Sequence, residues 1–175
     1  NYFSYVRQLV GEDGYLSLAY KADGSLASTR LPYDDKYGPI DSSQTAINLF
    51  VFTQMSALNK RMKLLDDLYP TLVSPMANFL SEFVDDQGLP NASYEYPSDR
   101  RSSTLYTAAV TYAALYAAAD MADGKKMQDD AIRWRTTANT LRESAQVFVS
   151  ERGVLGRSLD DDSSDISGLY GAFMF

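Results

Sequence analysis

Histidine and cysteine are both absent from the 175 residues of this chain. Their absence excludes a Ser-His-Asp triad, a Cys-His dyad and a zinc site built from the usual ligands. It also excludes disulfides, so the cysteine count indicates nothing about the redox compartment. Any acid–base chemistry by side chains must therefore come from carboxylates, tyrosine or lysine.

Positive charge and long apolar runs are also scarce. The 16 Lys and Arg residues against 23 Asp and Glu residues give a net charge of −7, which argues against a nucleic-acid partner because phosphate binding requires a basic face. No apolar run approaches the ~18–20 residues that span a bilayer, so we expect no membrane partner. With 45% apolar and 22% charged residues, the composition is typical of a soluble globular protein and leaves its compartment open.

Helical spacing of apolar residues recurs along the chain, and Gly, Pro and polar residues separate the helical segments. The pattern predicts helices over residues 1–10, 42–58, 69–84, 103–124 and 125–151. The second begins at Ser42 or Ser43, whose hydroxyl groups suit a helix N-cap, and Pro75 bends the third or marks its true start. Residues 15–29 predict a short hairpin or an extended excursion. The sequence therefore predicts an all-α fold of antiparallel helix pairs.

The apolar residues also predict which helix faces are buried. In the helix from residue 42, the set at helical spacing is Ala46, Ile47, Phe50, Val51, Met55 and Leu58. In the helix over 125–151, it is Met127, Ala131, Trp134, Ala138, Leu141, Ala145 and Phe148. The helix over 103–124 is rich in alanine on every face, which lets neighbouring helices approach closely, so we expect it to be central and buried.

The longest irregular stretch, residues 85–103, contains the aromatic and apolar residues Leu89, Tyr94 and Tyr96. Long loops in compact domains are usually functional or disordered, and these side chains favour a functional loop. The chain also has 13 tyrosines. Tyrosine combines an apolar ring with a polar tip, which suits both half-wet cores and sugar-binding clefts.

Several segments together resemble glycoside hydrolase family 15, the glucoamylase and glucodextranase family. They are ADGSLASTRLPY, GPIDSSQTAINLFVF, SYEYPSDRRSSTLYTAAVTYAALYAAADMAD, AIRWRTTANTLRESAQVFVSERGVLGRSL and DSSDISGLYGAF, in the family's order over residues 23–175. The resemblance implies an (α/α)6 barrel of six helical hairpins. Because the chain holds fewer hairpins, we expect residues 1–175 to be a single segment that forms about half of the catalytic domain, with the remainder of that domain as its partner.

The resemblance also implies a chemistry, the inverting hydrolysis of α-glucosidic bonds in oligosaccharides or polysaccharides of α-linked glucose. In such enzymes one carboxylic acid protonates the leaving oxygen, and a second carboxylate about 6.5–9.5 Å away activates water. Bond cleavage of this kind requires no metal ion and no organic cofactor, so we expect neither.

The general acid of the family lies in a Trp-Glu-Glu pattern, which reads Pro97-Ser98-Asp99 in this chain. A serine hydroxyl cannot replace the acid because its pKa lies far above neutrality. We therefore take Asp99, one residue further along, as the candidate catalytic acid and Glu95 as the second candidate. The substrate contacts that the resemblance implies are Tyr33, Tyr37, Tyr94, Tyr96 and Arg100.

Two further positions depart from the family pattern. The acidic substrate-contacting position before the helix that begins near residue 42 reads Ser42-Ser43-Gln44, and the family's Trp-His-Pro reads Arg30-Leu31-Pro32. These departures leave open a homologue that binds carbohydrate without hydrolysing it. A tetratricopeptide-like helical-repeat module stays open as well, although no 34-residue period recurs along the chain.

We predict that the isolated 175-residue chain releases no glucose from maltooligosaccharides, because half of a barrel leaves the inner seam of the site open. The measurement is glucose release by the purified chain, with an active glucoamylase in the same assay as a positive control. Robust turnover by the isolated chain would contradict the prediction.

Overall fold

The computed structural model describes residues 2–28, 38–59, 66–95, 100–151, 153–161, 163, 166 and 169. Helices dominate these residues, which confirms the predicted all-α class. The helical elements are α1 (Tyr2–Val10), α2 (Ser42–Asn59), the π-helical turn η1 (Tyr69–Val73), α4 (Ser74–Glu82), α5 (Leu105–Gly124), α6 (Gln128–Ser144) and the 3-10 turn η2 (Ala145–Phe148). The short strands are β1 (Leu16–Ser17), β2 (Ile40–Asp41), β3 (Ser93–Glu95) and β4 (Arg100–Ser102).

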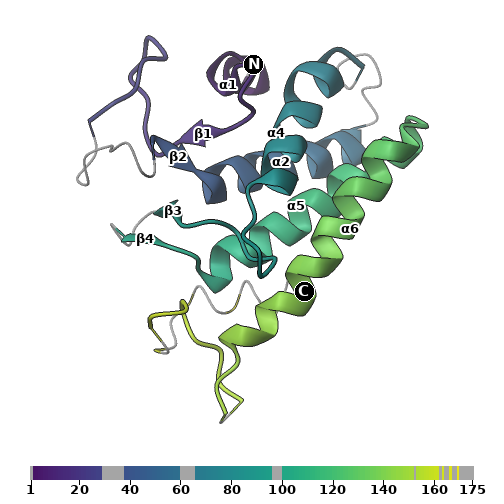
Figure 1. Cartoon of the computed structure of the whole chain (residues 1–175). Coiled ribbons are helices and arrows are strands. Elements are labelled where there is room, and N and C mark those ends of the chain that lie inside the picture. The colour runs from purple at the N-terminus through teal and green to yellow at the C-terminus, as the bar shows by residue number, and fades with distance from the viewer. Residues whose placement is uncertain are drawn as a thin grey trace.

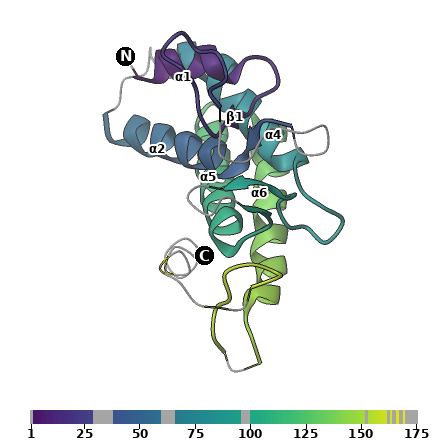
Figure 2. The ribbon, with the colours of Figure 1, turned by 90° about the vertical axis from the view of Figure 1, so that its left-hand side faces the viewer.

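Helix α5 lies at the centre of the arrangement (Figure 1). It packs against α2 on one side and runs antiparallel to α6 on the other, while α4 contacts α2, α5 and α6. The four short strands all lie at one side of the helices, which is the side that faces the viewer in Figure 2. No helix in the described part of the chain is long and apolar enough to cross a membrane.

The central place of α5 follows from its alanines, as predicted. Ala108, Ala109, Ala114, Ala118, Ala119 and Ala122 are all 0% exposed. Small side chains bring helix axes close together, so α2 and α6 both reach the α5 backbone. The helix begins after Thr104, whose hydroxyl accepts a hydrogen bond from the backbone N–H of Thr107 at 3.1 Å and so caps the first turn.

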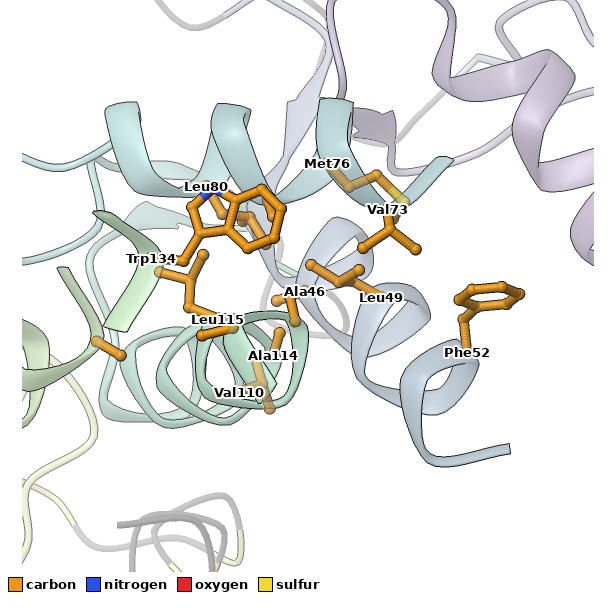
Figure 3. Packing of buried hydrophobic residues seen from close by; sticks show 14 of the residues in the cluster. Ala46, Leu49, Phe52, Val73, Met76, Leu80, Val110, Ala114, Leu115 and Trp134 are labelled. Atoms are coloured by element: carbon orange, nitrogen blue, oxygen red, sulfur yellow. The ribbon is translucent and has the colours of Figure 1, made fainter. Parts of the chain in front are cut away.

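Figure 3 shows the core between these helices. Ala46 and Leu49 of α2 lie between α4 and α5, and Trp134 of α6 lies beside Leu80 of α4. The indole of Trp134 is fully buried, and its N–H donates to the side-chain oxygen of Asn78 at 2.9 Å. The largest side chain of the core is thus packed and hydrogen-bonded at once, as buried indoles usually are.

The predicted buried face of α2 is correct in part. Ala46 is buried, and Ile47 and Phe50 pack against the core. Val51, Met55 and Leu58 are instead 40%, 47% and 82% exposed, while Leu49 and Phe52, which the prediction omitted, are buried. On α6 the predicted face is correct except at Met127, which is 49% exposed because it precedes the helix.

Other boundaries differ in ways that local chemistry explains. The predicted helix over 69–84 is divided into η1 and α4, and Pro75 lies in the first turn of α4, where its missing N–H costs nothing. The stretch over 85–103, expected to be irregular, contains the paired strands β3 and β4. Residues 15–28 do contain a short hairpin, closed by the Tyr20–Leu26 bridge.

We predict that Gly14→Ala lowers the free energy of unfolding by roughly 2–4 kcal/mol, because backbone strain and a clash add together. Gly14 has φ +80°, and a Cβ there would lie 2.2 Å from the carbonyl oxygen of Pro75. Gly11 is the matched control, since it has φ +60° and a Cβ added to it would meet nothing within 4 Å. We expect Gly11→Ala to cost about 1 kcal/mol by backbone strain alone. Equal losses in urea denaturation would contradict the close approach.

Candidate functional site

Two strand pairs meet at one end of the helices. β1 pairs with β2 through Leu16–Asp41 and Ser17–Ile40, and both pairs of strands are antiparallel. β3 contacts both β2 and the start of α2. We call this region, made of β1 to β4 and the first α2 residues Ser42–Thr45, the hairpin end; it faces the viewer in Figure 2. The structure therefore places the start of α2 beside β3, which the antiparallel ladder pairs with β4.

Buried hydroxyl groups connect the elements of the hairpin end. The hydroxyl oxygens of Ser42 and Ser93 are 2.7 Å apart and share a hydrogen bond between α2 and β3. The hydroxyl of Thr45 accepts from the N–H of Leu16 in β1 at 2.8 Å and donates to the carbonyl of Asp41 in β2 at 2.9 Å. All three hydroxyl-bearing residues are at most 2% exposed. Water therefore does not compete for these bonds, and each donor and acceptor depends on its protein partner.

Asp41 is the buried carboxylate of the hairpin end, and among the described residues no other carboxylate is classed as buried. One carboxylate oxygen accepts from the Ser43 hydroxyl at 2.8 Å and from the N–H of Gln44 at 2.9 Å. This is N-cap geometry, so the predicted caps Ser42 and Ser43 are wrong and the residue before them caps α2. Sequence reasoning missed Asp41 as a site residue, although an aspartate before a helical pattern is a cap signal.

The candidate residues of the sequence fall into three groups in this geometry. Tyr33, Tyr37, Tyr96 and Asp99 lie outside the described residues. Glu95 and Arg100 are directly opposite each other in the β3–β4 register. Tyr94 is 1% exposed, so the chain itself buries the ring that we expected to contact a sugar.

Tyr69 and Arg135, on the helices, have shifted pKa values. Burial, and then the neighbouring carboxylate of Asp130, raises the pKa of Tyr69, whose hydroxyl donates to that carboxylate at 3.2 Å. Hydrogen bonds to Asp123 and Asp120 raise the pKa of Arg135. Both groups have their partner on a neighbouring helix, so these two shifts report contacts between helices. The described residues contain no group of three or more Asp or Glu side chains that could hold a metal ion.

A groove runs between α2 and α5 with a volume of about 350 Å³. It is lined by Phe50, Gln54, Tyr112, Ala113, Tyr116, Ala117 and Asp120. The rings of Tyr112 and Tyr116 are 5.7 Å apart between centroids, and Asp120 pairs with Arg135 of α6 at 2.7 Å. Aromatic rings and alanines form most of the lining, so the groove is a mainly apolar surface.

Comparison with solved structures finds a similarity of fold. The structure is similar to that of a bacterial glucoamylase complexed with acarbose, with a TM-score of 0.66 and 19% sequence identity. The chains share an all-α glucoamylase-like fold. The similarity covers 93% of this chain and 22% of that one, so this chain spans about a fifth of the length of the glucoamylase. No protein-family model matches the chain, and no curated protein sequence matches it.

We predict that Asp41→Ala lowers the free energy of unfolding by about 1–2 kcal/mol, because the α2 cap is lost and its buried donors remain. Asp23 is the matched control. Its carboxylate also accepts from a hydroxyl and an N–H, both of Ser25, but in an exposed turn. We expect Asp23→Ala to leave the free energy of unfolding nearly unchanged. Equal effects of the two substitutions in urea denaturation would contradict a cap whose value depends on burial.

Proposed function

We propose that this chain is part of an (α/α)6 barrel of the glycoside hydrolase type, and that its hairpin end binds oligosaccharides of α-linked glucose. The observation that supports this most is the fold similarity to a glucoamylase over nearly the whole chain. That glucoamylase was solved with acarbose bound. The convergence of two strand pairs at one end of the helices adds support, because binding residues concentrate on loops that a rigid scaffold positions.

The proposed sugar contacts are Tyr33, Tyr37, Tyr96 and Arg100. A tyrosine ring packs against the apolar face of a pyranose, and its hydroxyl exchanges hydrogen bonds with sugar hydroxyls. Tyr94 is assigned instead to holding the hairpin, because its ring is buried.

For hydrolysis, we propose that Asp99 is the catalytic acid, with Glu95 as the second candidate. The acid would protonate the leaving glycosidic oxygen, and a carboxylate from the remainder of the barrel would take a proton from the attacking water. The products are a shortened oligosaccharide and a glucose of inverted anomeric configuration.

We further propose that the remaining helices of the barrel pack on the groove between α2 and α5, because that surface is mainly apolar.

Carbohydrate binding without hydrolysis is the second candidate function. It is favoured by Ser98, which lies at the position of the family's acid and cannot donate the proton. It is also favoured by Asp41, because a buried carboxylate that caps α2 is not exposed to a substrate. Turnover by a longer protein that contains this chain distinguishes the two functions, since binding alone produces no glucose.

The test is a titration of the isotope-labelled 175-residue chain with maltoheptaose, followed by amide chemical shifts. We expect saturable shifts at residues 41–45 and 93–102, and none at the exposed face of α6. Cellohexaose, a β-linked glucose oligosaccharide, is the control ligand and is expected to leave these shifts unchanged.

The matched variants are Asp99→Asn, which removes a candidate contact, and Asp86→Asn, which removes an exposed carboxylate from the loop before β3. We expect the first to weaken binding several-fold and the second to leave it unchanged. Shifts that are absent, scattered over the helices or identical with cellohexaose would refute the proposed function.

A further inference from the structure

The hydroxyl pair Ser42–Ser93 joins segments that are 51 residues apart in sequence. Ser42 and Ser93 are 1% and 2% exposed. The Ser93 oxygen also accepts from the backbone N–H of Ser42 at 3.3 Å and donates to the carbonyl of Tyr94 at 3.3 Å. Ser93 therefore contacts both the first turn of α2 and the backbone of its own strand.

Ser93 is the first residue of β3, and its partner in the register, Ser102, is the last residue of β4. The pair Ser93–Ser102 thus forms the base of the β3–β4 hairpin, and the pair Glu95–Arg100 forms the other end of the ladder. A rotation at the base moves everything beyond it, so the orientation of the Glu95–Arg100 end depends on how the base is held.

The α2 side of this contact is itself held in place. Asp41 caps the helix through the N–H of Gln44, and Thr45 connects the same turn to β1 and β2. Buried hydrogen bonds that water cannot replace make this turn rigid. The Ser42 hydroxyl on the turn is therefore held in a fixed position, against which the β3–β4 hairpin is oriented.

We propose that Ser42 and Ser93 are positioning residues, which hold the β3–β4 hairpin against α2 and thereby orient its Glu95–Arg100 end towards a bound ligand. The ligand part of this inference rests on the proposed function. The positioning part does not, and it has a consequence that needs no ligand. Loss of either hydroxyl frees the hairpin while the packing of α5 against α6 is unchanged.

The experiment measures amide hydrogen exchange in the 175-residue chain and in the variants Ser42→Ala, Ser93→Ala and the double variant. We expect Ser42→Ala to speed exchange in residues 93–102 about tenfold, because one buried hydrogen bond is lost and its partner is left unpaired. Ser93→Ala also removes the bonds to the Ser42 N–H and the Tyr94 carbonyl, so we expect at least the same effect. Exchange in α5 and α6 is expected to stay unchanged. The double variant is expected to exchange no faster than Ser93→Ala, since the bond lost in Ser42→Ala is among those that Ser93→Ala removes.

Ser81→Ala is the matched control. Ser81 is also buried, at 9% exposure, but its hydroxyl donates within α4 to the carbonyl of Asn78 at 2.8 Å. We expect this variant to leave exchange in residues 93–102 unchanged. Exchange that rises equally in α5 and α6, or additive effects in the double variant, would overturn the positioning role.

Maltoheptaose binding separates this inference from the proposed function. Faster local exchange together with several-fold weaker binding supports both. Faster local exchange in a chain that never binds maltoheptaose refutes the proposed function and supports the positioning role. Unchanged binding by Ser42→Ala and Ser93→Ala, in a chain that does bind, overturns the orientation of the Glu95–Arg100 end towards the ligand.

Discussion

The close approach of helices to the alanine-rich surface of α5 is the contact on which the rest of the structure depends. Because α5 carries alanines on more than one face, α2 and α6 pack on different faces of this one helix, and α4 contacts both of them. Larger side chains at Ala114 or Ala118 would push these helices apart. The first residues of α2 and α5, which follow β2 and β4 in the chain, would then move apart. The two strand pairs of the hairpin end would no longer lie next to each other.

The hairpin end adds a second constraint, which is electrostatic. A buried hydroxyl or carboxylate must find a hydrogen-bond partner, because its lost hydration is otherwise uncompensated. Asp41, Ser42, Thr45 and Ser93 meet this requirement by bonding to one another's segments. The same hydrogen bonds that satisfy these buried groups also hold the first residue of β3 against α2. They therefore contribute both to the stability of the fold and to the position of the β3–β4 hairpin.

Much of the fold was predictable from the sequence, because the spacing of apolar residues along one segment indicates whether that segment is helical. The alanine content of α5 also predicted its central place, since small side chains let neighbouring helices approach closely. The candidate site was less predictable. Asp99 stays a prediction, and Tyr94 proved to be buried. Asp41 was overlooked because Ser42 and Ser43 are cap residues of similar preference, and the sequence pattern does not show which of the three accepts the N–H of the first turn.

The sequence by itself determined the excluded chemistries, the all-α class and the central helix, because each follows from composition or from spacing along one segment. Only the tertiary structure decided which apolar stripe of α2 is buried and that Ser42 meets Ser93. The physical reason is the same in both cases. Periodicity shows that a helix has an apolar face, but the neighbour that covers a face, or bonds to a hydroxyl 51 residues away, is set by packing.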